Sequence, residues 1–416
     1  MRALAGIWLR RVAGERTLRS TISRDSCRPK LVSDLRSIDD REGAVNLEYI
    51  LGKVSEIMHW DTDRSRDEFA WLGLMAKIKY DGYEDFRAGV RFVESLADWL
   101  QQFPQAEREV AYGFVRRHLV YIGPAEMNHL VELFFPETVQ WRLMQAAADQ
   151  CGCPTYRVWA DAAATALYQR LLRQTLFLEL SDGARIDVFR RANAGIVSNE
   201  QIITAPRINR AKWDGVLKDL RESLKDTEAR FAFVFLVDDF IASGTTLLRW
   251  ESEKACWNGK LLRFWEDIQK AGVVGTHFQP DWVLCVHHYL ATHRGRVTAE
   301  ERQEEALRSR KKEGKEWFER VKFSYGAVLP EDFPVDQARH GEFLKLVHKY
   351  YDESIDTKHL KLGGEDTRLG FGKCALPLIL EHNTPNNSLA LLWADTAGKG
   401  GKHAMRPLFR SRQRHT

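Results

Sequence analysis

Apolar residues follow a helical spacing through the first part of the chain. From residue 45 to residue 150 they recur in consecutive segments that are punctuated by Pro104, Gly123-Pro124 and Pro136. The segments are AVNLEYILGKVSEIMHW, RDEFAWLGLMAKIKY, DFRAGVRFVESLADWLQQF, EREVAYGFVRRHLVYIG and PAEMNHLVELFF. This pattern predicts an all-helical domain over residues 39–150.

The pattern changes after the segment DQCGCP, residues 149–154, where we expect a domain boundary. Unbroken apolar runs such as TLFLEL, FAFVFLV and DWVLCVHHYLA are typical of strands that are covered on both faces of a parallel sheet. Helical segments such as KWDGVLKDLRESLKD and KLLRFWEDIQKAG lie between them, as right-handed crossovers require. We predict an α/β domain over residues 151–396, with a mainly parallel sheet flanked by helices. The highly charged stretch at about residues 291–320 predicts a helical insertion with a solvated face.

The positive charge of the chain lies in its two ends. Residues 1–38 carry nine basic against three acidic side chains, residues 397–416 carry six against none, and the remainder has a net charge of −8. We predict basic, disordered tails at 1–38 and 397–416. A transit peptide is the alternative for the first tail, if the gene is eukaryotic. The central part has no net basic field that would attract nucleic acid.

The cysteines and the hydropathy bound the environment of the protein. The cysteines are scattered without a CxxC pair, which predicts a cytoplasmic protein in a reducing compartment. No segment approaches the roughly 20 apolar residues of a membrane span. His287 and His288 end an apolar run without a partner motif, so we expect core or edge residues and no direct metal ligand.

Candidate chemistry follows the apolar run that begins at Phe231. Asp238 and Asp239 stand where the predicted strand ends, and a helix-like segment begins at Leu247. The small and hydroxyl-rich residues between them are Ala242, Ser243, Gly244, Thr245 and Thr246. Such a loop before a helix N-terminus is suited to bind a phosphate, and the two acids are suited to sugar hydroxyls or a hydrated Mg²⁺. A solvated acid pair beside a helix cap is the structural alternative.

The segment VDDFIASGTT resembles the signature of type I phosphoribosyltransferases that binds 5-phosphoribosyl 1-diphosphate (PRPP). The resemblance implies that Asp238 and Asp239 hold the 2′ and 3′ hydroxyls of the ribose. It implies that residues 242–246 bind the 5-phosphate, and that Mg²⁺ accompanies the substrate.

The resemblance also implies a pyrophosphate loop ahead of the signature and a mobile basic loop. The candidate for the first is Ser181, Asp182, Gly183 and Arg185, in the segment LSDGAR, although Ser-Asp-Gly also fits a hairpin turn. The candidate for the second contains Arg207, Arg210 and Lys212, and a solvated charged loop is the alternative.

A polar cluster follows the apolar segment LPLILEH near the end of the chain. His382, Asn383, Asn386 and Asn387 could bind a nucleobase or another acceptor, and the alternative is a Pro-Asn turn between two strands. Together, the three motifs resemble phosphoribosyltransferase-like proteins of prokaryotic conflict systems, including antiphage and retron-associated cassettes. This resemblance implies a pentosyl-transferring or nucleotide-cleaving effector, and the alternative is a non-catalytic PRPP or nucleotide sensor.

The helical domain provides no chemistry of its own. A winged-helix reader of nucleic acid is one interpretation of residues 39–150, but no basic face is clustered there. We favour a bundle that packs on the catalytic domain or on a protein partner. We also expect a homo-oligomer.

Overall fold

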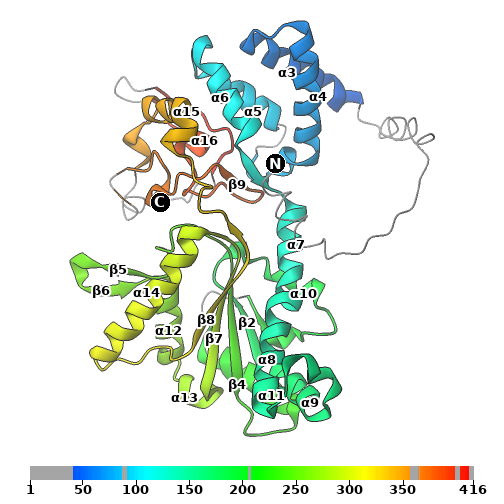
Figure 1. Ribbon diagram of the computed structural model, residues 1–416, viewed down its shortest axis with the longest axis vertical. Helices are drawn as coiled ribbons and strands as arrows, with labels where there is room; N and C mark the ends of the chain where they lie inside the picture. The colour runs from blue at the N-terminus through cyan, green and yellow to red at the C-terminus, as the bar shows by residue number, and fades with distance from the viewer. Residues whose placement is uncertain are drawn as a thin grey trace, which may run out of the picture.

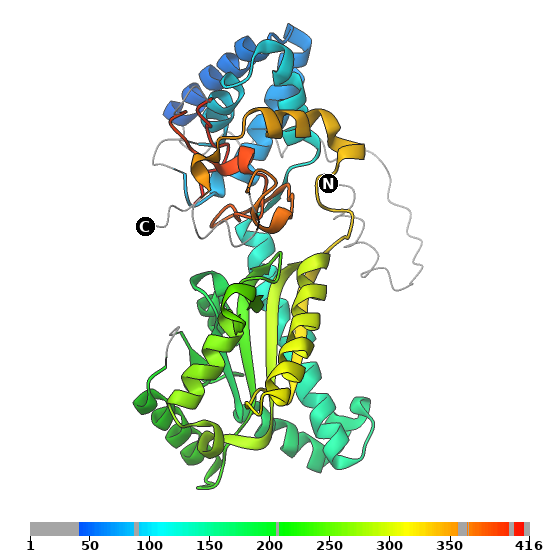
Figure 2. The same ribbon diagram turned by 90° about the vertical axis from the view of Figure 1, so that its left-hand side faces the viewer.

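The computed structural model describes residues 41–86, 91–204, 208–356, 364, 366–398 and 403–411. They form two bodies, one above the other in Figures 1 and 2. The upper body consists of the described residues of 41–122 and 335–411, and the lower body of those of 123–334. The chain therefore crosses between the bodies twice.

A parallel sheet of five strands forms the centre of the lower body, in the order β3-β2-β4-β7-β8. Its strands are β2 (Thr175–Glu179), β3 (Ile202–Ile203), β4 (Phe231–Ile241), β7 (Phe278–Thr292) and β8 (Val321–Leu329). All four pairings are parallel. The predicted α/β class and mainly parallel sheet are confirmed.

Helices cover both faces of this sheet, which explains the unbroken apolar runs in its strands. Phe235 of β4 faces one buried cluster, which includes residues of α7, α8, α9 and α10, while Leu236 faces the other, which includes residues of α11, α12 and α14. The helices are α7 (Pro124–Phe134), α8 (Gln140–Cys151), α9 (Ala162–Arg173), α10 (Ile186–Ala192), α11 (Arg210–Leu224), α12 (Lys260–Lys270), α13 (Val274–His277) and α14 (His293–Lys312). A π-helical turn, Phe135–Val139, joins α7 to α8, so the chain stays helical through Pro136.

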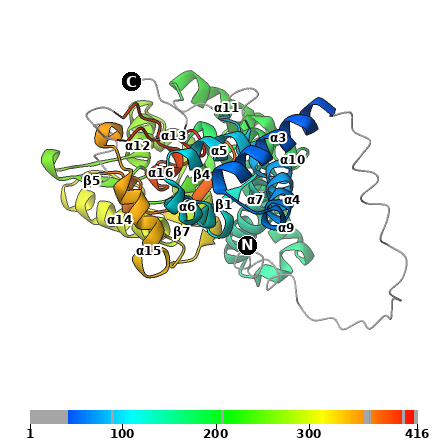
Figure 3. The same cartoon turned by 90° about the horizontal axis from the view of Figure 1, so that it is seen from above.

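The upper body is assembled from two distant parts of the chain. Its N-terminal part contains α3 (Arg41–Met58), α4 (Thr62–Ile78), α5 (Phe92–Gln101), α6 (Gln105–Arg117) and β1 (Val120–Ile122). Its C-terminal part contains α15 (Gln337–Lys349), β9 (Leu378–Leu380) and α16 (Ala390–Trp393). α6 and α15 lie side by side (Figure 3), where the rings of Phe114 and Phe343 stack with centroids 3.6 Å apart. β1 pairs in parallel with β9.

This packing corrects the predicted domain limits. α7 and α8 belong to the sheet-containing body, so the change of body comes at Gly123 and not near residue 150. The N-terminal region is not purely helical, because it contributes β1. The tail predicted at 397–416 includes Leu408 and Phe409, which are fully buried in the upper core. The tail predicted at 1–38 lies outside the described residues.

The charged segment near residue 300 also needs a correction. It forms α14, which connects the parallel neighbours β7 and β8, so it is the crossover that this pairing requires and not an insertion. Its face toward the sheet is buried at Gly295, Ala299, Gln303 and Ala306, and most of its other residues are charged.

Candidate functional site

The acid pair lies near the carboxyl end of the central strand β4, which continues past it to Ile241. Asp238 is only 3% exposed. Lys260, the first residue of α12, places its Nζ 2.5 Å from Asp238 Oδ2, and the Ser181 hydroxyl donates to Asp238 Oδ1. Burial raises the pKa of Asp238, although the charge of Lys260 opposes this effect.

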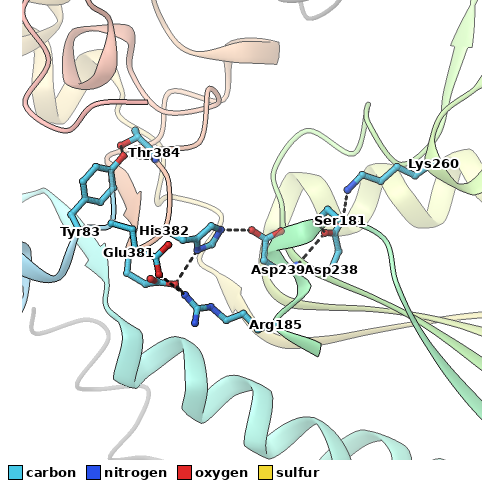
Figure 4. A network of polar contacts seen from close by, with 10 residues as sticks. Tyr83, Ser181, Arg185, Asp238, Asp239, Lys260, Glu381, His382 and Thr384 are labelled. Carbon is cyan, nitrogen blue, oxygen red and sulfur yellow. Dashed lines mark hydrogen bonds and ion pairs between the residues drawn. The ribbon is translucent and has the colours of Figure 1, made fainter. Parts of the chain in front are cut away.

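Asp239 turns toward the upper body, where it meets His382 (Figure 4). The Nε2 atom of His382 lies 2.8 Å from Asp239 Oδ2, and its Nδ1 atom lies 3.0 Å from Glu381 Oε1. Burial by itself would raise the pKa of Asp239, but the hydrogen bond and charge of His382 outweigh burial and lower it. The two neighbouring acids therefore have pKa values that are shifted in opposite directions.

The predicted phosphate loop is confirmed as a loop, but no helix follows it directly. Residues 245–247 form a turn, and a hairpin of β5 (Arg249–Glu251) and β6 (Cys256–Asn258) separates it from α12. The amide N–H groups of Leu247 and Leu248 both donate to the carbonyl oxygen of Gly244, at 3.2 Å. The expectation of a helix N-terminus at Leu247 is wrong, because these amides close a turn.

Helix α14 holds this loop from behind. Gly244 has a φ of +72°, and a Cβ on it would lie 3.0 Å from Thr298 Cβ. Arg302 donates from Nη1 to the carbonyl oxygen of Leu248 at 3.0 Å and to Thr245 Oγ1 at 3.4 Å. The loop is therefore fixed by packing, although the charged helix had been predicted to be a solvated insertion.

A small cavity of about 100 Å³ lies between Asp238 and the loop. Asp238, Lys260, His288 and Asn387 contribute polar groups to its lining. Ala242, Ser243, Gly244 and Thr246 of the predicted phosphate loop also line it. Thr245 is not among the lining residues and receives the hydrogen bond from Arg302.

The predicted pyrophosphate segment reaches the same acids. Asp182–Ala184 form a short 3₁₀ turn between β2 and α10, so the hairpin interpretation is wrong. Gly183 allows the close approach, since a Cβ there would lie 2.6 Å from Asp239 Oδ2. Arg185 forms an ion pair with Glu381 of the upper body. Burial, followed by the charge of Asp182, raises the pKa of the nearby Glu179 to about 7.

The residues of the polar cluster after β9 have different partners and do not form one site. His382 contacts Asp239, Asn387 lines the cavity, and the Asn386 carbonyl oxygen accepts from the Phe371 amide at 2.7 Å. Asn383 makes a bridge to Leu380 within the turn. The predicted second strand after this turn is wrong, because residues 390–393 form the helix α16.

The predicted basic loop is only partly described. Arg207 lies outside the described residues. Arg210 begins α11, where it pairs with Asp214 at 2.9 Å and donates to the carbonyl oxygens of Ala271 and Gly272 at 3.0 Å. Lys212 lies exposed in the same first turn.

His287 and His288 are confirmed as buried residues, but β7 continues beyond them to Thr292. Burial lowers the pKa of His288 to about 3. No group of three or more His, Cys, Asp or Glu side chains suited to a metal occurs in the described part of the chain. Among the described helices, none is long and apolar enough to cross a membrane.

Two residues of the site were missed in the sequence. Lys260 is 22 residues beyond Asp238, and the intervening hairpin hides the relation between them. Glu381 was seen only as the start of a polar turn, yet its side chain is 1% exposed and holds both His382 and Arg185. In the sequence, the only sign of Lys260 is that a lysine directly follows Gly259.

Comparisons with known proteins support a narrow conclusion. No significant match was found among curated proteins or among solved structures. One family model, PRTase-CE, matches residues 96–410, which include the two acids, the predicted phosphate loop and the polar turn after β9. Since this match covers most of the chain and the fold agrees with it, the protein belongs to the phosphoribosyltransferase-type family PRTase-CE.

Proposed function

We propose that the protein binds PRPP, or a closely related phosphorylated ribose, at the carboxyl end of β4. The observation that carries this proposal is a cavity lined both by the buried Asp238 and by the hydroxyl-bearing loop, with Asp239 next to Asp238 in the chain. Carboxylates accept hydrogen bonds from sugar diols, and loop hydroxyls donate to phosphate oxygens. A phosphorylated sugar matches both halves of the site.

The segment at 181–185 is proposed to receive the pyrophosphate. Its support is that Ser181 donates to Asp238, that Gly183 lies close to Asp239, and that the same segment carries the guanidinium of Arg185, which is paired with Glu381. Mg²⁺ prefers carboxylate and phosphate oxygens, so Asp238 and Asp239 are of the donor type that would hold a hydrated ion next to the diphosphate. When bound, the ion would neutralise negative charge on the leaving group.

The proposed reaction is substitution at the anomeric carbon: the bond to pyrophosphate breaks, and a bond to a nucleophilic atom of the acceptor forms. The residues of this chain would orient the sugar, neutralise the leaving group and exclude water. We propose Asn386 and Asn387 as amide contacts for the acceptor, since Asn387 lines the same cavity as Asp238. Incubation with PRPP, Mg²⁺ and pooled nucleobases or nucleotides, followed by mass spectrometry for pyrophosphate, tests turnover.

The first prediction is that Asp238→Asn and Asp239→Asn abolish PRPP binding in calorimetry with Mg²⁺, because each removes a charged acceptor for a ribose hydroxyl. Asp281→Asn is the matched control, since Asp281 is 70% exposed near the start of β7. Circular dichroism checks that each variant folds. Unchanged binding in both site variants would refute the assignment of the acids.

A PRPP sensor without turnover is the second candidate. One observation favours it: Asp239 contacts His382 of the upper body. A ligand that binds Asp239 would therefore change a contact of the upper body. PRPP binding without pyrophosphate release would support this candidate.

For the biological setting we propose antiphage defence, which rests on the sequence resemblance alone. Phage plating on cells that carry the native gene cluster, with wild-type protein or Asp238→Asn, tests it. Equal plating on both strains would contradict a role for this site in defence.

A further inference from the structure

Both acids of the candidate site already have basic side chains of the chain itself as partners. Lys260 occupies Asp238, and the ring of His382 lies between Asp239 and Glu381 (Figure 4). Both ring nitrogens of His382 lie within hydrogen-bond distance of carboxylate oxygens. These contacts use carboxylate oxygens that a sugar diol would need.

The space between Asp238 and the loop is also too small for the proposed ligand. The cavity has about 100 Å³, whereas ligand pockets commonly have roughly 300–1,000 Å³. A second cavity of about 400 Å³ lies beside it, between the sheet, α11 and α12. Lys260 is a lining residue of both cavities, so its position on Asp238 bears on the space of each.

We propose that Lys260 and His382 are autoinhibitory contacts, which hold the site closed and must be displaced from the acids before a phosphorylated sugar can bind. This inference rests on the proposed function and specifies how the same site is regulated. Lys260 closes the site from within the lower body. His382 closes it from the upper body.

The contact of His382 links ligand binding to the arrangement of the two bodies. His382 follows β9 of the upper body, and Asp239 belongs to β4 of the lower body. The ion pair between Arg185 and Glu381 crosses the same junction. A sugar that takes the place of His382 on Asp239 removes one of these cross-body contacts and loosens the junction.

The test measures PRPP affinity by calorimetry, with Mg²⁺, in the full chain and in three variants. His382→Ala should bind PRPP roughly tenfold more tightly than wild type, because a charge-assisted hydrogen bond no longer has to be broken. Glu381→Gln keeps the shape but weakens the hold on His382, so it should give a smaller gain. His348→Ala, an exposed histidine of α15, is the control and should match wild type.

Hydrogen exchange provides a second readout. PRPP should speed amide exchange in residues 381–388 of wild type, and His382→Ala should show faster exchange there without ligand. If His382→Ala binds PRPP more weakly than wild type, and wild type still binds it, the autoinhibitory role of His382 is overturned. The proposed function is not. Binding of PRPP by His382→Ala but not by wild type would support the autoinhibitory role of His382. If neither wild type nor any variant binds PRPP, the proposed function is overturned, and with it the autoinhibitory contacts that depend on it.

Discussion

At the scale of single residues, close approach decides which side chains the site can tolerate. Gly183 and Gly244 both stand where a Cβ would meet another residue within 3.0 Å. At Gly183 the neighbour is Asp239, and at Gly244 it is Thr298 of α14. The acids and the loop are therefore positioned by residues whose contribution is the absence of a side chain.

Gly244→Ala should reduce PRPP affinity at least tenfold, because the new Cβ pushes the loop away from α14 while φ remains positive. Gly152→Ala is a matched control, since Gly152 has a φ of +66° with nothing within 4 Å of the added Cβ. Both variants should lose roughly 1 kcal/mol of stability from backbone strain. Equal affinities in calorimetry would contradict the role of loop packing.

At the scale of elements, strand β7 carries two buried histidines at the centre of the sheet. His287 accepts or donates a hydrogen bond to Ser324 of β8 at 2.9 Å, while His288 lies in register with Asp238. Burial, and then the charge of Lys260, lowers the pKa of His288 to about 3 from its ordinary 6.5. The folded state thus keeps this ring neutral at pH values where the unfolded chain protonates it.

This shift predicts an acid-sensitive fold. Since the folded pKa lies below the unfolded one, the stability is complete above pH 6.5 and is lost as pH falls toward 3. The loss approaches roughly 1.4 kcal/mol per pH unit for one histidine. We measure the free energy of unfolding in urea between pH 6.5 and 5. In His288→Leu its dependence on pH should be smaller than in wild type by the contribution of one titrating histidine. An unchanged slope would show that His288 is not held neutral.

At the scale of the whole molecule, the C-terminal segment packs against the N-terminal part of the upper body. Phe409 stacks with Phe92 of α5 at a centroid distance of 5.6 Å and lies edge-on to Tyr83 at 5.1 Å. Tyr83 in turn contacts Thr384 through a hydrogen bond of 2.9 Å, two residues from His382. The C-terminal segment therefore supports the surroundings of the site from outside it.

Phe409→Ala should cost about 3–5 kcal/mol, as expected for a buried phenylalanine. Leu74→Ala is the control and should be nearly neutral, since Leu74 is 57% exposed. Hydrogen exchange should become faster in α5 than in β4, because α5 packs directly on the lost ring. A similar effect on both elements would contradict a defect centred in the upper body.

The sequence by itself determined the α/β class, the central strands and the acid pair with its loop. These features depend on local periodicity and on residues that are adjacent in the chain, such as Asp238 and Asp239. Arg185 was also found as part of a candidate anion loop, although its partner Glu381 was not recognised.

Only the tertiary structure decided what surrounds those residues. Lys260 reaches Asp238 across a hairpin, His382 reaches Asp239 from the other body, and Phe409 returns to helices more than 300 residues away. Periodicity reports which side of an element is buried, but not which distant element covers it. The chain divides into two bodies at Gly123, and both acids are bound by other side chains of the protein. Both features follow from such long-range contacts, so they could be seen only in the folded chain.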